Sequence, residues 1–205
     1  GFCGLMIDMS SSHPHDTIRL GVELASQGIH LIDAPVSGGV KKAAAGTLMI
    51  MAGGKADDIA TASALIACFG TMQHVGPLGA GHAMKALNNY VSAAGLLASM
   101  QALATAECFG ITAENFTSVI NESTGRNNTT EVKLMQFIAS RRYDSGFYLR
   151  LMAKDVSIAS ELMTTAGFDT PTTPALNDFL AAALETLGHD ADHTGLYEML
   201  NPTPK

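Results

Sequence analysis

The chain has 205 residues, and 19 acidic residues against 12 Lys and Arg give it a formal net charge of −7. A chain of this length can form one or two domains with a substantial buried core. The acidic balance and the lack of a basic run argue against nucleic acid and anionic membranes as partners, which leaves small neutral or anionic molecules.

The composition also limits the core and the compartment. Hydrophobic residues make up 47% of the chain but aromatic residues only 6%, so aliphatic side chains and Met must build the core. The three cysteines, Cys3, Cys68 and Cys108, are far apart and form no Cys-x-x-Cys pair. This spacing predicts free thiols, a cytoplasmic location and no structural zinc site. The apolar stretch at residues 91–106 is interrupted by polar residues, so we expect a buried helix there and not a membrane span.

The first part of the chain alternates between short apolar runs and helical patterns. Four runs predict strands: residues 5–9, 30–33, 47–51 and 72–75. Two longer patterns predict helices: residues 14–28, with Pro14 in the first turn, and residues 57–69. Strands that alternate with helices in this way indicate part of an α/β sheet.

The strongest break in the pattern is Gly-Pro-Leu-Gly-Ala-Gly at residues 76–81. After this segment no strand pattern returns. Six helices are expected there: residues 82–110, 113–121, 128–140, 149–166, 172–187 and 193–200. We therefore divide the chain into an α/β domain at residues 1–78 and an all-helical domain at residues 79–205.

Ser37, Gly38 and Gly39 follow the second predicted strand. Paired glycines and a hydroxyl at the carboxyl end of a strand present backbone N–H groups that can hold a carboxylate or a phosphate. The alternative is an ordinary tight turn.

Lys85 and Asn89 are four residues apart at the start of the long predicted helix, so they share one helical face. A lysine in an apolar helix near a domain junction can exchange protons with a bound molecule. The alternative for Lys85 is a solvated side chain. Lys154 and Asp155 interrupt another apolar stretch, and a surface charge pair is their plainest interpretation.

Two motifs in the sheet part resemble signatures of the β-hydroxyacid dehydrogenase family. Residues 8–14 are similar to its Asp-x-Ser-Thr-x-x-Pro cofactor loop, with Ser11 where the family usually has Thr. Residues 33–39, Asp-Ala-Pro-Val-Ser-Gly-Gly, match its substrate-binding signature.

The helical part continues the resemblance. Gly81, Lys85 and Asn89 fall on the family's Gly-x-x-x-Lys-x-x-x-Asn pattern, and residues 152–155 contain its late Lys-Asp motif. Residues 123–127 are similar to a Ser-x-Gly-Arg stretch of members close to 3-hydroxyisobutyrate dehydrogenase. The resemblance covers nearly the whole chain and is closest to those members.

The resemblance implies a partial Rossmann-like α/β sheet followed by an all-α domain like the C-terminal domain of 6-phosphogluconate dehydrogenase. It implies oxidation of a short 3-hydroxy acid, with hydride passing to NAD or NADP. It also implies roles for seven residues: Lys85 as general acid/base, Ser37, Gly38, Gly39 and Asn89 as substrate ligands, and Ser11 and Lys154 as cofactor ligands. A partial sheet leaves a strand edge uncovered, so we expect this edge and the helix at residues 82–110 to be buried against a second copy in a homodimer or higher homo-oligomer.

One family feature has no counterpart in this sequence. The family's Gly-x-Gly-x-x-Gly turn, which holds the cofactor pyrophosphate, is imitated only at residues 79–84, where Met84 replaces the last glycine. A helix with the expected catalytic lysine follows directly. We therefore expect the main cofactor-binding half to be absent from these residues.

Alternatives remain for the function and for one acidic cluster. The chain could act as a helical oligomerisation fragment without catalysis, or as an enzyme for tartronate semialdehyde or threonate.

One cluster near the end of the chain could bind a metal: His189, Asp190, Asp192 and His193. Two histidines at i and i+4 are not enough for a metal site without further ligands. We expect no metal here, because residues 189–192 resemble the family's last interhelical turn, which implies that Asp192 caps the last helix.

Overall fold

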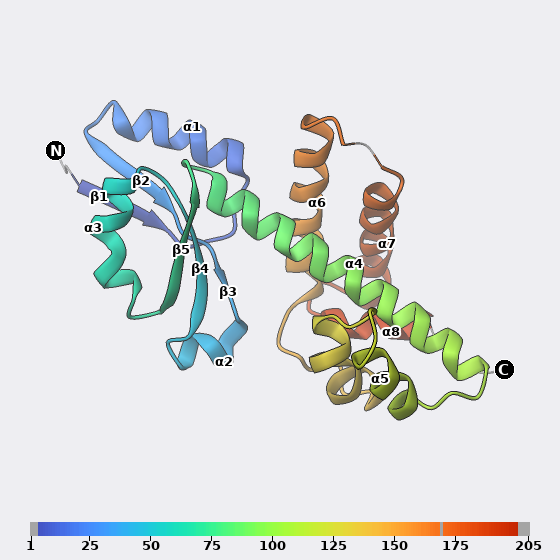
Figure 1. Ribbon diagram of the computed structural model, residues 1–205. Helices are drawn as coiled ribbons and strands as arrows, with labels where there is room; N and C mark the ends of the chain where they lie inside the picture. Colours follow the sequence, from blue (N-terminus) through green and yellow to red (C-terminus); the bar gives the residue numbers. More distant parts are fainter. Residues whose placement is uncertain (1–3, 169, 201–205) are drawn as a thin grey trace. The chain divides into compact units, whose positions relative to one another are not determined.

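The computed structural model describes residues 4–168 and 170–200, so Cys3 lies outside the described residues. The chain divides into two compact units, Gly1–Asn88 and Asn89–Lys205. The first contains a sheet with helices, and the described part of the second contains helices and their connecting turns (Figure 1). This confirms the predicted fold class, an α/β sheet followed by an all-helical region.

Five strands form the sheet of the first unit: β1 (Gly4–Asp8), β2 (Ile29–Asp33), β3 (Val36–Ser37), β4 (Leu48–Gly53) and β5 (Gly70–Gly76). β1 pairs with β2 in parallel, and β4 pairs with β5 in parallel. β4 runs antiparallel to β2 and to β3. In the β1–β2 register Asp8 lies opposite Asp33, so both parallel strands end at the same edge of the sheet.

Three helices belong to this sheet: α1 (Pro14–Ala25), α2 (Gly39–Ala44) and α3 (Ala56–Ile66). Pro14 opens α1, as predicted, because its missing N–H group needs no partner in a first turn. The core beneath the helices is aliphatic: Ile32, Ala34, Leu48, Ile50, Ala52, Ile59, Ala62 and Ile66. β3 and α2 were not predicted. Two residues of strand, and six residues rich in Ala and Lys, are too short for a periodic apolar pattern.

The helical part contains α4 (Ala80–Cys108), α5 (Ala113–Asn121), the π-helix η1 (Thr129–Ala139), α6 (Leu149–Thr165), α7 (Thr172–Leu187), the 3₁₀ helix η2 (His193–Leu196) and α8 (Tyr197–Leu200). The six predicted helices are therefore present, although the last is split in two and the third has π geometry. No helix within the described residues is long and apolar enough to cross a membrane.

α4 begins in the first unit and continues into the second. Its buried residues in the second unit recur at alternating steps of three and four: Ala93, Leu96, Met100 and Leu103. This spacing puts them on one stripe of the helix, which packs into a core with side chains of η1, α6 and α7. Leu134, Met152 and Leu180 are among the partners.

Candidate functional site

Lys85 and Asn89 are one turn apart on α4, which is a continuous helix over both positions. Lys85 is half-buried and Asn89 is buried. The predicted pairing of these two side chains on one helical face therefore rests on regular helix geometry.

Asp155 holds the Asn89 side chain. The Nδ2 group of Asn89 donates to Oδ2 of Asp155 over 2.5 Å, and Nζ of Lys154 lies 3.4 Å from Oδ1 of the same carboxylate. Asp155 is buried, while 41% of the Lys154 side chain is exposed. The bond from Nδ2 to the carboxylate orients the side-chain amide of Asn89.

The Lys154–Asp155 pair is therefore more than a surface charge pair. Adjacent residues of a helix point about 100° apart, so α6 buries one member and exposes the other. From the sequence, Asp155 was noted only as part of a charge pair and a Lys-Asp motif, and it was assigned no role in the site. The available signal was an acidic residue inside an apolar helical stretch, where burial requires a hydrogen-bonding partner.

Ser37, Gly38 and Gly39 connect β3 to α2. Ser37 pairs with Met49 of β4, and Gly38 and Gly39 have φ angles of +140° and +67°. A Cβ atom on Gly38 would lie 2.8 Å from Cβ of Lys42, whereas one on Gly39 would meet nothing within 4 Å. The backbone of this turn needs glycine, and the space beside Gly39 is open to a ligand.

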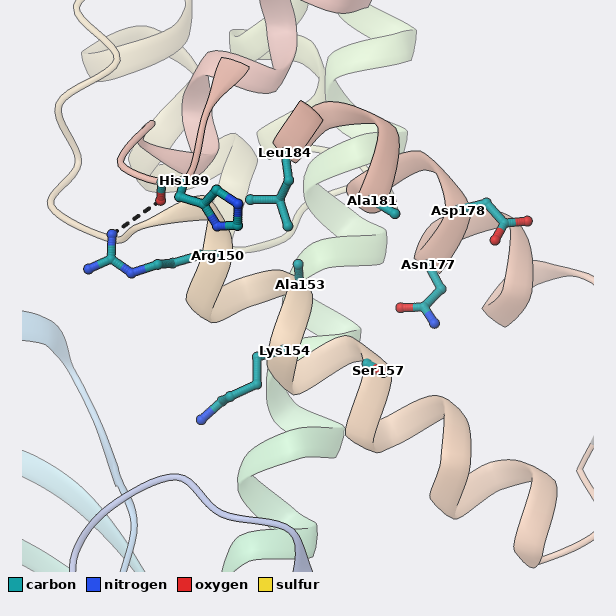
Figure 2. A pocket seen from close by; sticks show the side chains of 9 residues that line it. All are labelled: Arg150, Ala153, Lys154, Ser157, Asn177, Asp178, Ala181, Leu184 and His189. Carbon is teal, nitrogen blue, oxygen red and sulfur yellow. Dashed lines mark hydrogen bonds between the residues drawn. The ribbon is translucent and has the colours of Figure 1, made fainter. Parts of the chain in front are cut away.

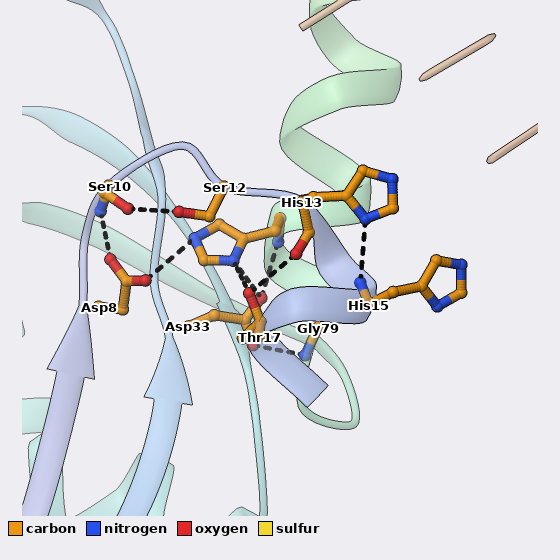
Figure 3. A network of polar contacts seen from close by, with 9 residues as sticks. Asp8, Ser10, Ser12, His13, His15, Thr17, Asp33 and Gly79 are labelled. Carbon is orange, nitrogen blue, oxygen red and sulfur yellow. Dashed lines mark hydrogen bonds and ion pairs between the residues drawn. The ribbon is translucent and has the colours of Figure 1, made fainter. Parts of the chain in front are cut away.

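Ser11 lies in the turn between β1 and α1. Oδ1 of Asp8 accepts a bond of 2.9 Å from the Ser10 amide, and the hydroxyls of Ser10 and Ser12 are 2.9 Å apart (Figure 3). The turn is thus ordered by its own side chains, with Ser11 half-buried between them. It leaves the sheet at the edge where β2 also ends, which is where open α/β sheets bind ligands.

The start of α4 is bonded to the same edge of the sheet. The carboxylate of Asp33, which is fully buried, accepts a 2.8 Å bond from the Gly79 amide and a 2.7 Å bond from the His82 amide. Nδ1 of His82 lies 2.8 Å from Oγ1 of Thr17 on α1. The first unit therefore brings the Ser11 turn, the strand that leads to Ser37 and the first turn of the Lys85 helix to one edge.

The second unit contains a pocket of about 420 Å³ between α6 and α7 (Figure 2). Its polar lining includes Arg150, Lys154, Ser157, Asn177, Asp178 and His189. The Arg150 guanidinium donates to the carbonyl oxygen of His189 over 3.2 Å and pairs with Asp190. Lys154 is thus shared between this pocket and the Asp155 carboxylate.

Comparison with known proteins identifies the family. A family model described as "NAD-binding of NADP-dependent 3-hydroxyisobutyrate dehydrogenase" matches residues 79–200. A second model, for the NAD binding domain of 6-phosphogluconate dehydrogenase, matches residues 4–77. The chain belongs to the β-hydroxyacid dehydrogenase family.

Individual relatives agree with this assignment. The chain is 35% identical over 158 residues to 2-(hydroxymethyl)glutarate dehydrogenase of Eubacterium barkeri, a match of 77% of this chain and 52% of that protein. It is 32% identical over 199 residues to 3-hydroxyisobutyrate dehydrogenase of Pseudomonas aeruginosa, covering 94% of this chain and 66% of the relative. The chain spans about half the length of the curated relatives that it matches first.

A solved structure is also similar. It is the 3-hydroxyisobutyrate dehydrogenase of Mycobacterium tuberculosis with L-serine, which superposes with a TM-score of 0.86 at 29% identity. The match covers 96% of this chain and 69% of that one.

Ser11, Lys154 and the glycines of residues 79–84 are the groups to test for their fit to a nicotinamide cofactor. Ser11 offers a hydroxyl at the strand edge, and Lys154 offers a partly exposed ammonium group. The glycines of residues 79–84 do not form a phosphate cradle, because the Gly79 and His82 amides are bonded to Asp33. A Cβ atom on Gly81 would lie 2.3 Å from the Met51 carbonyl oxygen, so this glycine packs against the sheet. Residues 79–84 therefore do not fit the pyrophosphate of the cofactor.

The acidic cluster near the end of the chain has a structural role. Asp192 accepts 2.9 Å from the Thr194 amide and 2.8 Å from the Gly146 amide, which confirms the predicted cap at the start of the last helical segment. Burial alone would raise the pKa of Asp192, but hydrogen bonds from Thr194 and Ser145 lower it below its ordinary value. Across residues 4–168 and 170–200, no group of three or more His, Cys, Asp or Glu side chains could hold a metal ion.

Proposed function

We propose that the protein is, or forms part of, an NAD(P)-dependent dehydrogenase that oxidises a short 3-hydroxy acid such as 3-hydroxyisobutyrate. The observation that carries this proposal is the α4 face with Lys85 and Asn89, where the buried Asp155 carboxylate orients Asn89. A base beside a fixed amide is the arrangement that oxidation of an alcohol needs, because the hydroxyl must be oriented and must lose a proton.

In the proposed mechanism each of the proposed substrate ligands and the proposed base has one role. The hydroxyl of Ser37 and the amides of Gly38 and Gly39 bind the substrate carboxylate. Asn89 binds the substrate hydroxyl, and the neutral amine of Lys85 accepts its proton as the carbonyl forms. When bound, NAD or NADP supplies the hydride acceptor for the carbon that carries the hydroxyl. Lys85 then holds the proton that left the substrate hydroxyl, as an ammonium group. In the reverse direction Lys85 returns this proton to the new alkoxide.

Ser11 and Lys154 are proposed to contact the nicotinamide end of the cofactor. Their support is the position of the Ser11 turn at the carboxyl end of β1 and the partly exposed ammonium group of Lys154. Cys68 and Cys108 are exposed free thiols, which supports a reducing, cytoplasmic location.

The substrate can be decided by a panel of acids. The named relatives act on 2-(hydroxymethyl)glutarate and 3-hydroxyisobutyrate, and L-serine is present in the similar solved structure. We expect the full-length protein to reduce NAD or NADP with 3-hydroxyisobutyrate at a higher kcat/KM than with L-serine, threonate or 2-(hydroxymethyl)glutarate. Absorbance of the reduced cofactor measures this rate. No cofactor reduction with any of these acids would contradict the proposed function.

We also propose that residues 79–205 form a helical domain that assembles into a homodimer or higher homo-oligomer, and that residues 1–78 form the α/β domain. Large apolar side chains on the helical unit support the assembly: Val91, Phe109 and Val119 are 68%, 81% and 67% exposed. Sedimentation velocity should show a species at least twice the chain mass, and Phe109→Ser should shift it toward monomer. A wild-type monomer at micromolar concentration would contradict the assembly. If the chain were a fragment without catalytic activity, this assembly would be its remaining function.

A further inference from the structure

Asp33 connects the sheet to the helix that contains Lys85. It is the last residue of β2, and its side chain is fully buried. Oδ1 accepts from the Gly79 amide and Oδ2 from the His82 amide, at the first turn of α4 (Figure 3). The first amides of a helix have no partner inside the helix, so this carboxylate caps α4 from another element.

The backbone of two neighbouring elements lies close to this carboxylate. A Cβ atom on Gly53 of β4 would lie 2.4 Å from Oδ1 of Asp33, and one on Gly81 would lie 2.8 Å from Oδ2. The same Gly53 Cβ atom would also lie 2.8 Å from the Gly81 nitrogen. Two glycines therefore let β4 and α4 close around the carboxylate, which no larger residue would permit.

His82 extends the connection to β1 and α1. Its ring is buried, with Nδ1 2.8 Å from Oγ1 of Thr17 and 3.8 Å from Oδ2 of Asp33. Its Nε2 lies 3.9 Å from Oδ2 of Asp8, the last residue of β1. The first turn of α4 is thus attached at its backbone to Asp33 and at its side chain to two other elements.

We propose that Asp33 is a positioning residue that sets the location of the Lys85 amine relative to the substrate carboxylate site. Lys85 follows the bonded His82 amide by three residues, less than one helical turn. The backbone of Asp33 leads within four residues to Ser37. One buried side chain therefore fixes the distance between the proton acceptor and the acid-binding turn. This inference rests on the proposed function of Lys85.

The test uses Asp33→Asn and the NMR signal of Lys85. Asn preserves the side-chain shape but presents an NH₂ group to a backbone N–H donor, so one cap bond is lost. Lysines are dimethylated with ¹³C, and the Lys85 resonance is assigned by its loss in Lys85→Arg. In Asp33→Asn this resonance should shift or broaden while that of Lys55, at the start of α3, stays in place.

The control is Asp58→Asn. Asp58 also contacts a histidine of the same unit, since its Oδ1 lies 2.6 Å from Nδ1 of His30, but it caps no part of α4. The Lys85 resonance should be unchanged in this variant. An unchanged Lys85 resonance in folded Asp33→Asn would overturn the proposal, as would an equal change at Lys55.

A measurement on the wild-type chain decides the case if Asp33→Asn does not fold. The first turn of α3 has no side-chain cap, so the Asp57 amide is its natural reference. The Gly79 and His82 amides should exchange with solvent at least about tenfold more slowly than the Asp57 amide, as expected for bonds to a carboxylate. Equal exchange rates would overturn the cap.

Kinetics separate this inference from the proposed function. In the active enzyme, Asp33→Asn should lower kcat about tenfold and leave the cofactor KM unchanged, because a displaced base affects the chemical step. An unchanged kcat would overturn the positioning role. An inactive wild-type enzyme would contradict the proposed function alone, since the NMR and exchange results do not depend on turnover.

Discussion

At the scale of single residues, a buried carboxylate decides what a neighbouring polar group can do. Asp155 accepts from Asn89 and pairs with Lys154, so two proposed ligands depend on one side chain. A buried charge without its partners is costly, which makes such a residue important for both stability and geometry.

Asp155→Asn tests this dependence. The variant should lose about 1.5–3 kcal/mol of folding free energy, the range for a hydrogen bond to a charged group. It should also raise KM for the hydroxy acid, because the Asn89 amide can then turn over. Urea unfolding and steady-state kinetics measure the two effects.

Glu185→Gln is the control for this variant, because Glu185 is an exposed carboxylate of α7 that does not line the pocket. It should leave both quantities unchanged. Asp155→Asn kinetics that match the wild type would show that Asn89 does not need this partner.

Gly38→Val tests the carboxylate turn. Its φ angle of +140° disfavours any side chain, and the new Cβ would meet Lys42. We expect KM for the acid to rise at least about tenfold, with a smaller change in the cofactor KM, because the amides would no longer converge on the carboxylate. Gly167→Val is the control, since Gly167 also has a positive φ, +78°, but lies outside the site. A Gly38→Val enzyme with the wild-type KM would exclude this turn as the anchor.

At the scale of elements, Asp192 and His193 connect η2 to the turn before α6 through hydrogen bonds and a ring contact. Nδ1 of His193 lies 3.0 Å from the Phe147 carbonyl oxygen, and its ring packs edge-on against Phe147 at 5.4 Å. Burial and the nearby Lys133 ammonium lower the pKa of His193 from 6.5 to about 4. The histidine is therefore neutral in the folded protein at neutral pH.

This lowered pKa predicts how stability depends on pH. Between pH 6.5 and about 4 the unfolded chain binds a proton at His193 that the folded chain does not, so stability falls as pH falls through this range. The full effect is about 3 kcal/mol, from about 1.4 kcal/mol for each pH unit. Below the ordinary pKa of Asp192, 3.8, protonation of that carboxylate removes its contribution as well.

Urea unfolding at pH 7.5 and pH 5 tests this prediction. His193→Gln should have a lower stability at pH 7.5 but a smaller loss on acidification than the wild type. The exposed His189→Gln should behave like the wild type at both values. The same acid loss in His193→Gln as in the wild type would assign the dependence to other groups.

At the scale of the whole molecule, the sequence predicted the structural features that depend on the local pattern of apolar and polar residues. In the helices of the second unit, apolar residues recur at helical spacing over many residues, which makes these helices predictable. Lys85 and Asn89 share a face because residues four apart in an α-helix lie on the same side. β3 and α2 were too short for such a pattern. The π geometry of η1 was not visible either, because an apolar period does not distinguish it from an α-helix.

The parts of the site that were missed depend on contacts between distant segments. Asp33 bonds to amides more than forty positions later in the chain, and Asp155 bonds to Asn89, which lies 66 positions earlier. Nothing in the local pattern around either aspartate indicates which backbone or side chain it will face. Sequence motifs indicated that these segments matter, and the tertiary structure shows which atoms connect them.

The central claim, that Lys85 is the proton acceptor of a hydroxy acid dehydrogenase, is tested most directly by the turnover of Lys85→Ala. In the full-length enzyme with 3-hydroxyisobutyrate and saturating cofactor, kcat should fall by about 10² to 10⁴, the usual contribution of general acid/base catalysis. The cofactor Kd should stay near the wild-type value, and Lys55→Ala should have wild-type kcat. A Lys85→Ala enzyme that keeps more than about a tenth of the wild-type kcat would contradict the account.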